Sequence, residues 1–157
     1  MSVILLATID TKLDDVRGCT SLPDGRMVFS CLNKNSVRGF NRDGSQNFEI
    51  SLKPNGAFDI TYIHDNNTIA VTGGHQYISI IDVESRKVKE TIPVGSDNSG
   101  IVSRNNTLIY CSYNRGIQMI NLTDKSISNI ITTKMSTLVY VATFSDKLYY
   151  TNNDTHT

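Results

Sequence analysis

The chain has 157 residues and is 39% hydrophobic, so it is long enough and apolar enough to fold around a core. Its 15 basic and 15 acidic residues give a formal charge of zero, which argues against a general attraction to nucleic acids or anionic membranes. The three cysteines are scattered, with no Cys-x-x-Cys pair, as is typical of reduced intracellular thiols.

The N-terminal segment gives no sign of export or membrane insertion. Its apolar run is short, and no basic region precedes it as a signal peptide would require. No stretch of the chain approaches the ~20 apolar residues that span a membrane as a helix. We therefore expect a cytoplasmic protein without a membrane partner.

A turn rich in Asn, Asp or Gly leads repeatedly into a short run of β-forming residues. These runs begin at Met27, Ile69, Leu108 and Leu148, with spacings of 42, 39 and 40 residues. A period of roughly 40–50 residues in an all-strand pattern is typical of a β-propeller, a ring of about 4–8 four-stranded blades. The chain is therefore predicted to be all-β, a partial β-propeller of about three and a half four-stranded antiparallel blades with ~40-residue repeats.

The repeat divides the chain into one partial propeller over residues 1–157. Within the lead-in, Ile4–Ile9 is interpreted as an outer strand left over from a preceding blade. The predicted parts are a lead-in strand at 1–17, blades at 18–56, 57–99 and 100–138, and an incomplete blade at 139–157.

The second repeat shows the expected meander most clearly. Phe58–Ile63 alternates as a first strand, and the Asn and Asp residues that follow it predict a turn. Thr68–Thr72 is continuous in β-formers, which predicts a strand buried on both faces. Tyr77–Asp82 reads as a third strand, and Lys87–Ile92 alternates as a solvent-facing outer strand should.

Asn41, Asp82 and Asn121 occupy one equivalent position, just before the turn between the third and fourth strands. Short polar side chains at such a position bond to the backbone of the turn that follows. We therefore expect these residues to cap turns.

The segments LPDGRMVFS, AFDITYIHDNNTIAVT, GIVSRNNTLIYCS and VYVATFSDKLYYTNN resemble NHL-type propeller repeats. Their repeat sequence is similar to that of the C-terminal propellers of tripartite-motif proteins, over roughly Gly18–Thr157. WD repeats are a poorer match because the chain has no Trp, and Kelch repeats because only Gly73-Gly74 forms a glycine pair.

The resemblance implies a non-catalytic protein-interaction or scaffold module associated with ubiquitination. In tripartite-motif ubiquitin ligases the propeller recognises the substrate, while the ligase chemistry belongs to a RING, followed by zinc-binding B-boxes and a coiled coil. The sequence has neither zinc-ligand spacing nor a heptad run. Ligase activity is therefore not carried over, and no cofactor is expected.

The repeat register predicts a candidate binding face. One face of a propeller carries the loops between second and third strands and the connections between blades. Basic or imidazole groups flanked by amides suit a peptide or, alternatively, single-stranded RNA, with Tyr77 and Tyr113 nearby as stacking surfaces. The alternative to a binding face is that these loop residues are simply solvated and bind no ligand. The loop residues are Lys34, Asn35, His75, Gln76, Asn114 and Arg115, and the connections add Lys53–Asn55, Ser96–Asn98 and Lys134.

Catalysis finds little support in the sequence, so an enzyme is not expected. The three histidines show no metal-ligand spacing. A metal-dependent propeller hydrolase would need inward-facing ligands, and Asp59 is the one carboxylate that a first strand could aim at the axis. A lone carboxylate there is expected to bond the backbone instead. Cys31 and Cys111 fall in or beside apolar second strands, where we expect buried, inert thiols.

The last predicted strand, Leu148–Thr151, would leave an open sheet edge, and such edges invite pairing with another chain. Three interpretations stay open. The chain is a fragment of a longer protein, a second copy completes the ring, or the product folds poorly. Self-association through open sheet edges is therefore a further expectation.

Overall fold

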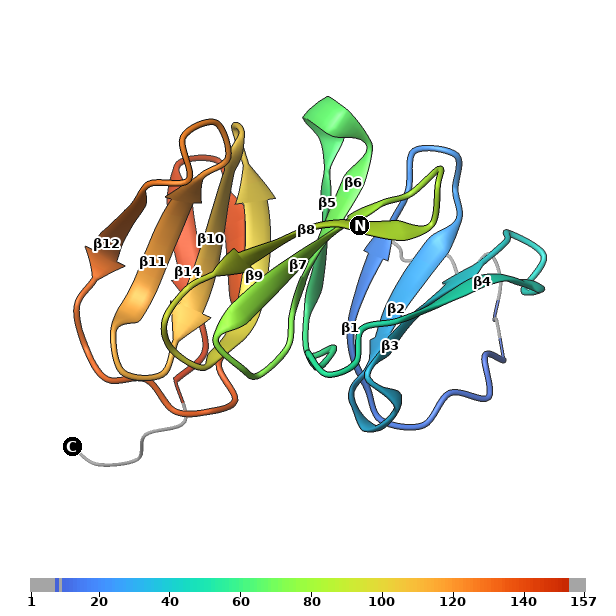
Figure 1. Cartoon of the computed structure of the whole chain (residues 1–157), viewed down its shortest axis with the longest axis horizontal. Coiled ribbons are helices and arrows are strands. Elements are labelled where there is room, and N and C mark those ends of the chain that lie inside the picture. Colours follow the sequence, from blue (N-terminus) through green and yellow to red (C-terminus); the bar gives the residue numbers. More distant parts are fainter. Residues whose placement is uncertain (1–7, 9, 153–157) are drawn as a thin grey trace, which may run out of the picture.

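The computed structural model describes residue 8 and residues 10–152. These residues form three four-stranded antiparallel sheets and one two-stranded sheet, and within each sheet the strands follow chain order. The sheets stand side by side, from the blue sheet of the first blade to the orange sheet of the third (Figure 1). The all-β, partial-propeller architecture predicted from the repeats is confirmed.

The strand bounds are as follows. Blade one contains β1 (Val16–Ser21), β2 (Met27–Cys31), β3 (Ser36–Phe40) and β4 (Gln46–Ser51). Blade two contains β5 (Ile60–Ile63), β6 (Thr68–Thr72), β7 (Tyr77–Asp82) and β8 (Lys87–Pro93). Blade three contains β9 (Asn98–Arg104), β10 (Thr107–Ser112), β11 (Gly116–Asn121) and β12 (Ile127–Ile131). The fourth sheet consists of β13 (Val141–Phe144) and β14 (Lys147–Tyr150).

One predicted strand start, that of β5, differs in the structure. β1 begins at Val16, ahead of the predicted blade boundary at residue 18, because Val16 pairs with Cys31 across a register shift. β5 begins at Ile60 rather than Phe58, because Phe58 and Asp59 both bond to Thr72. The Phe58 N–H donates to the Thr72 carbonyl at 2.6 Å, and the Asp59 N–H donates to the Thr72 hydroxyl at 3.0 Å. The strand proposed at Ile4–Ile9 falls almost entirely outside the described residues, and the described part of the lead-in before Val16 contains no strand.

Apolar residues between neighbouring sheets form the core. The first cluster joins blades one and two, the second joins blades two and three, and the third joins blade three to the β13–β14 sheet. Because blade two has a sheet on each side, all five residues of β6 are buried, as the sequence predicted. Representative members are Val28, Val37 and Ile69 in the first cluster, Ile78, Leu108 and Tyr110 in the second, and Ile117, Met135 and Val139 in the third.

Short polar residues end the strands. The Asp82 carboxylate accepts a hydrogen bond from the Ser85 backbone N–H at 2.7 Å. The Asn121 side chain accepts one from the Thr123 N–H at 2.8 Å, which confirms the expected turn caps at these two positions. The Asn41 side chain instead bonds the side chains of Ser45 and Asn47, each at 3.0 Å.

The inner strands approach one another closely near their first residues. Gly18, Asp59, Gly100 and Tyr140 follow one another at spacings of 41, 41 and 40 residues, so small and large residues alternate at this position. A Cβ atom on Gly100 would lie 2.6 Å from Tyr140 Cα, and one on Gly18 would lie 2.3 Å from Asp59 Oδ1. Glycine is therefore required at both positions, and Asp59 and Tyr140 occupy the space it leaves.

The helical segments within the described residues are two three-residue 3-10 turns, η1 (Leu32–Lys34) and η2 (His64–Asn66). Neither is long or apolar enough to cross a membrane.

Candidate functional site

The loops that follow β2, β6 and β10 lie at the same end of the blades as the connections that lead from each outer strand to the next inner strand. We call this end the loop face; it runs along the lower edge of the sheets in Figure 1. In each complete blade a backbone hydrogen bond ties the segment after the outer strand to the loop, at equivalent positions in blades one and two. These bonds are Leu52 N–H to Asn35 O at 2.7 Å, Val94 N–H to Gln76 O at 2.8 Å, and Met135 N–H to Tyr113 O at 3.0 Å.

The structure places all six predicted loop residues on the loop face, two in each complete blade. Asn35 is half-buried with a left-handed backbone, φ 48°, where a short amide side chain is tolerated. The side chains of the other five, Lys34, His75, Gln76, Asn114 and Arg115, are exposed. The side chains of these six residues make no hydrogen bonds or ion pairs with one another, so they share a face without forming a cluster.

A small hollow opens on the loop face between blades two and three and the connection that leads to β13. Its volume is about 80 Å³. We call it the axial hollow. Its lining residues are Phe58, Gly74, Asp97, Asn98, Ser99, Tyr113, Ser136 and Thr137.

Asn98 forms the rigid part of this hollow. Its side-chain amide donates to the carbonyls of His75 and Tyr77, and its oxygen accepts from the Gly73 N–H at 3.2 Å. Because the side chain is only 4% exposed and fully bonded, Asn98 holds the β6–β7 loop in place rather than meeting a ligand. The sequence had placed Asn98 on the candidate binding face but did not indicate that its side chain is structural.

Two polar groups of the axial hollow have no partner in the described part of the chain. The Ser136 hydroxyl oxygen is buried without a hydrogen bond. Asp97 is exposed, and while its backbone oxygen accepts from the Tyr113 N–H at 3.0 Å, its carboxylate makes no described bond. Beside the hollow, the Lys134 ammonium lies 5.2 Å from the centre of the Tyr113 ring, within the range of a cation–π contact.

Apolar groups are also exposed on this face. Tyr77 is 43% exposed, Leu138 45% and Tyr140 36%. The Tyr140 ring stacks on Phe58 with a centroid distance of 5.7 Å. Burial and the nearby Asp59 carboxylate raise the pKa of Tyr140. Sequence analysis missed Phe58, Leu138 and Tyr140, although their position beside the blade connections could have indicated them.

Asp59 is a structural carboxylate, as the sequence predicted. Its Oδ1 accepts from the Ile60 N–H at 2.9 Å, and its Oδ2 accepts from the Ile101 N–H at 3.0 Å. The residue is only 9% exposed. Burial raises the pKa of Asp59 to about 6, against the opposing effect of the two hydrogen bonds. Both carboxylate oxygens are engaged by the backbone.

The buried thiols lie where the sequence placed them. Cys111 and Cys31 are 0% and 1% exposed, while Cys19 is exposed. Burial raises the pKa of Cys111 to about 12 and also raises that of Cys31. Across residue 8 and residues 10–152, no three His, Cys, Asp or Glu side chains gather as metal ligands would.

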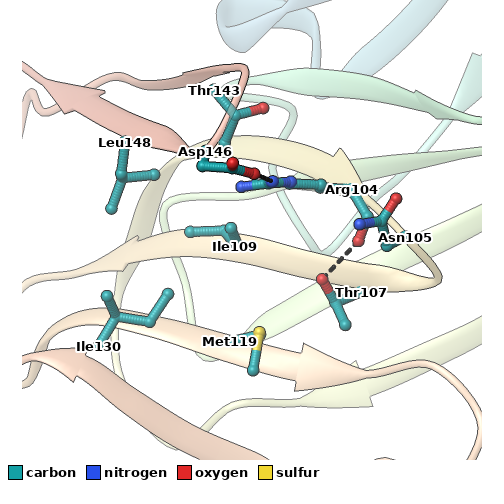
Figure 2. Close-up of a pocket in the computed structure, with 9 residues that line it drawn as sticks. All are labelled: Arg104, Asn105, Thr107, Ile109, Met119, Ile130, Thr143, Asp146 and Leu148. Carbon is teal, nitrogen blue, oxygen red and sulfur yellow. Dashed lines mark hydrogen bonds and ion pairs between the residues drawn. The ribbon is translucent and has the colours of Figure 1, made fainter.

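A larger groove lies away from the loop face, between blade three and the β13–β14 sheet. Figure 2 shows its apolar floor, formed by Ile109, Met119, Ile130 and Leu148, and the ion pair at its rim. The groove has a volume of about 380 Å³. Arg104 Nη2 and Asp146 Oδ1 are 2.7 Å apart. Within the described residues β14 pairs only with β13, so its outer edge is open.

The chain is similar in structure to β-propellers. A catalytically inactive virginiamycin B lyase from Staphylococcus aureus, solved with quinupristin, matches with a TM-score of 0.71 and 23% identity over 87% of this chain and 48% of that one. A structural-genomics protein of unknown function from Bacteroides thetaiotaomicron matches with a TM-score of 0.66 and 10% identity over 82% of this chain and 36% of that one. The WD40 repeats of RRP9 match with a TM-score of 0.63 and 18% identity over 73% of this chain and 38% of that one.

These likenesses establish the propeller fold. The chain spans less than half the length of each of these three structures. No family model matches the sequence, and no curated protein matches it either.

Proposed function

We propose that this chain is a non-catalytic recognition module whose loop face binds a protein partner. The observation that carries the proposal is the composition of that face, where Tyr77, Leu138 and Tyr140 are exposed together with Arg115 and the Lys134–Tyr113 contact. Among the described residues Arg115 has no ion-pair partner. Protein interfaces are enriched in tyrosine and arginine around apolar anchors, with a polar rim. Loops held by a rigid scaffold are also where binding residues concentrate.

Charge favours a protein over RNA. A phosphate backbone is held mainly by several Lys and Arg side chains. The formal charge of the chain is zero, and the Asp97 carboxylate lines the axial hollow. RNA remains the second candidate because Tyr77 is exposed and the Tyr113 ring already faces an ammonium, a combination that also suits stacked bases.

The resemblance to NHL repeats extends the proposal. On that resemblance, the module would act in the cytoplasm as the substrate-recognition propeller of a tripartite-motif ubiquitin ligase, with the ligase chemistry supplied by other domains. The non-catalytic part of the proposal is supported by Asp59, whose two carboxylate oxygens bond backbone N–H groups and are thereby withdrawn from chemistry or metal binding.

Self-association is a further part of the proposal. The open edge of β14 and the apolar groove beside it would accept a strand from another polypeptide. Phe144 and Tyr149, on β13 and β14, are 75% and 51% exposed, which adds apolar surface to this end of the chain.

The loop-face proposal is tested by photo-crosslinking in cells. The crosslinking residue p-benzoylphenylalanine replaces Tyr77 in one variant and Val88 in its control. Val88 is equally exposed, at 43%, but lies on the outer strand β8. We expect a protein adduct from position 77 that position 88 does not give. The same adducts from both positions, or none from position 77, would contradict the proposal, and adducts lost on ribonuclease treatment would indicate RNA.

A further inference from the structure

We propose that the axial hollow binds a basic side chain, a lysine ammonium or an arginine guanidinium, presented by the protein partner. This inference rests on the proposed function, because it specifies the chemistry of the group that the loop face recognises. It follows from the oxygen atoms of the hollow, its aromatic wall and its size.

The oxygen atoms of the hollow supply acceptors for a cationic donor. Asp97 contributes a carboxylate without a partner among the described residues, and its main chain is fixed by the Tyr113 N–H bond at 3.0 Å. Ser99 and Thr137 add hydroxyl groups. Charge-assisted hydrogen bonds from ammonium or guanidinium to carboxylate are stronger than neutral ones. A cation is the ligand that these groups bind best.

Ser136 is the second, independent indication of a ligand. The residue lines the hollow, and its hydroxyl oxygen is buried and bonds to no described group. Buried polar atoms without partners are rare, because leaving one unsatisfied costs free energy. A donor that enters the hollow would satisfy this oxygen.

The aromatic wall favours the same kind of ligand. The Tyr113 ring, which lines the hollow, already has the Lys134 ammonium 5.2 Å from its centre. This contact shows that the electron-rich face of the ring is accessible to a cation. Lys134 itself does not line the hollow, so the space beside Asp97 stays open.

The size of the hollow limits the ligand to a side-chain end. Its volume of about 80 Å³ corresponds to a few water molecules at about 30 Å³ each. That space admits an ammonium or guanidinium group with part of its carbon chain. An acidic group would face the Asp97 carboxylate and is disfavoured.

The test is an NMR titration of the ¹⁵N-labelled full chain with Nα-acetyl-lysine N-methylamide and with the arginine analogue. The neutral norleucine analogue controls for apolar contact, and the glutamate analogue controls for charge sign. We expect shifts of the amide signals of residues 97–99, 113 and 136–137 with the two cationic probes only. No shifts there with either cationic probe, or equal shifts with norleucine or glutamate, would overturn the proposal.

Variants connect the shifts to the hollow. Asp97→Asn should weaken binding of the cationic probes about fivefold, the effect of losing one charge-assisted bond at a solvated site. Asp65→Asn, an exposed aspartate in the η2 turn at the opposite end of the blades, should leave binding unchanged. Ser136→Ala should also weaken binding, and Lys134→Met should strengthen it by removing a competing cation. Equal binding by Asp97→Asn, Ser136→Ala and the unaltered chain would overturn the assignment.

The crosslinking experiment separates this inference from the proposed function. If adducts form at position 77 but no cationic probe binds, the face recognises a protein without the basic side chain, and only this inference fails. If adducts form at neither position, the proposed function fails.

Discussion

Asp59 and Ile101 are joined across two blades by a hydrogen bond of 3.0 Å from the Ile101 backbone N–H to the Asp59 Oδ2 atom. The other carboxylate oxygen accepts from Ile60 at 2.9 Å, so one side chain ties the start of β5 to β9. The absence of a side chain at Gly18 leaves the room that this carboxylate occupies. Asp59 therefore fixes the positions of the inner strands β5 and β9 relative to each other, next to the loop face.

The first prediction concerns pH. Burial raises the pKa of Asp59 from 3.8 to about 6 in the folded chain. The folded state therefore binds a proton more tightly than the unfolded state, and the Asp59 contribution to the free energy of unfolding decreases as the pH rises from about 4 to about 6. Since one pKa unit corresponds to about 1.4 kcal/mol, the decrease is roughly 3 kcal/mol.

Urea unfolding of the wild type and Asp59→Asn at pH 4.5, 5.5 and 7 checks this prediction. The variant lacks the titrating group, so the difference between the two free energies should change in this interval. The neighbouring groups that feel the Asp59 charge, Tyr140 and Cys111, both have raised pKa values and do not titrate in this range. Parallel pH profiles would show that Asp59 ionises normally in the folded chain.

The second prediction concerns the close approach of inner strands at Gly100. An alanine Cβ there would lie 2.6 Å from Tyr140 Cα and 2.7 Å from Val139 O, and these backbone atoms cannot rotate away. Gly100→Ala should therefore lower the free energy of unfolding by about 1–3 kcal/mol through overpacking.

Gly74→Ala serves as the matched control in the same denaturation experiment. A Cβ at Gly74 meets nothing within 4 Å, and only its positive φ of 72° opposes the substitution. We expect a loss of about 1 kcal/mol for this variant. A Gly100→Ala protein as stable as the wild type would mean that β9 and β13 are further apart than the structure shows.

The third prediction concerns a single peptide group held at both ends. The Ser30 hydroxyl donates to the Phe58 carbonyl at 2.7 Å, and the Asp59 N–H of the same peptide group donates to the Thr72 hydroxyl at 3.0 Å. Ser30→Ala and Thr72→Val should each cost about 1–3 kcal/mol, because each leaves buried backbone groups unsatisfied.

Because the two bonds polarise the same peptide group, they should also be coupled. In a double-mutant cycle measured by urea unfolding, the double variant should lose less stability than the sum of the single losses, by about 0.5 kcal/mol or more. Strict additivity would contradict the coupling.

The repeat pattern predicted most of the fold because strand and turn chemistry are local. Thr68–Thr72 and Tyr77–Asp82 are strands with the predicted bounds, and Asp82 caps the turn as expected. The start of β5 was placed two residues too early, since Phe58 and Asp59 alternate correctly but both bond to the single residue Thr72, whose hydroxyl accepts from the Asp59 N–H. A contact of that kind depends on tertiary structure and leaves no periodic signal.

The candidate site was predictable only in outline. Repeat register placed Lys34, His75 and Arg115 on one face because they follow equivalent strands. The axial hollow was not foreseen, because Phe58 comes from the second repeat, Tyr113 and Ser136 come from distant parts of the third, and they meet only when the blades pack. Sequence spacing identifies equivalent positions in successive repeats, whereas the residues that line this hollow occupy non-equivalent positions.

The last prediction concerns thiol reactivity. Cys19 is exposed, whereas Cys31 and Cys111 are 1% and 0% exposed, and burial raises the pKa of both. Because the thiolate is the reactive form, iodoacetamide at pH 8 should modify Cys19 rapidly and the other two only when the chain opens. Mass spectrometry should therefore show one adduct on the folded protein and three in urea. The Cys19→Ser variant should show none before unfolding. Rapid modification of Cys111 would mean that the interface between blade three and β13–β14, where its side chain is packed, opens readily.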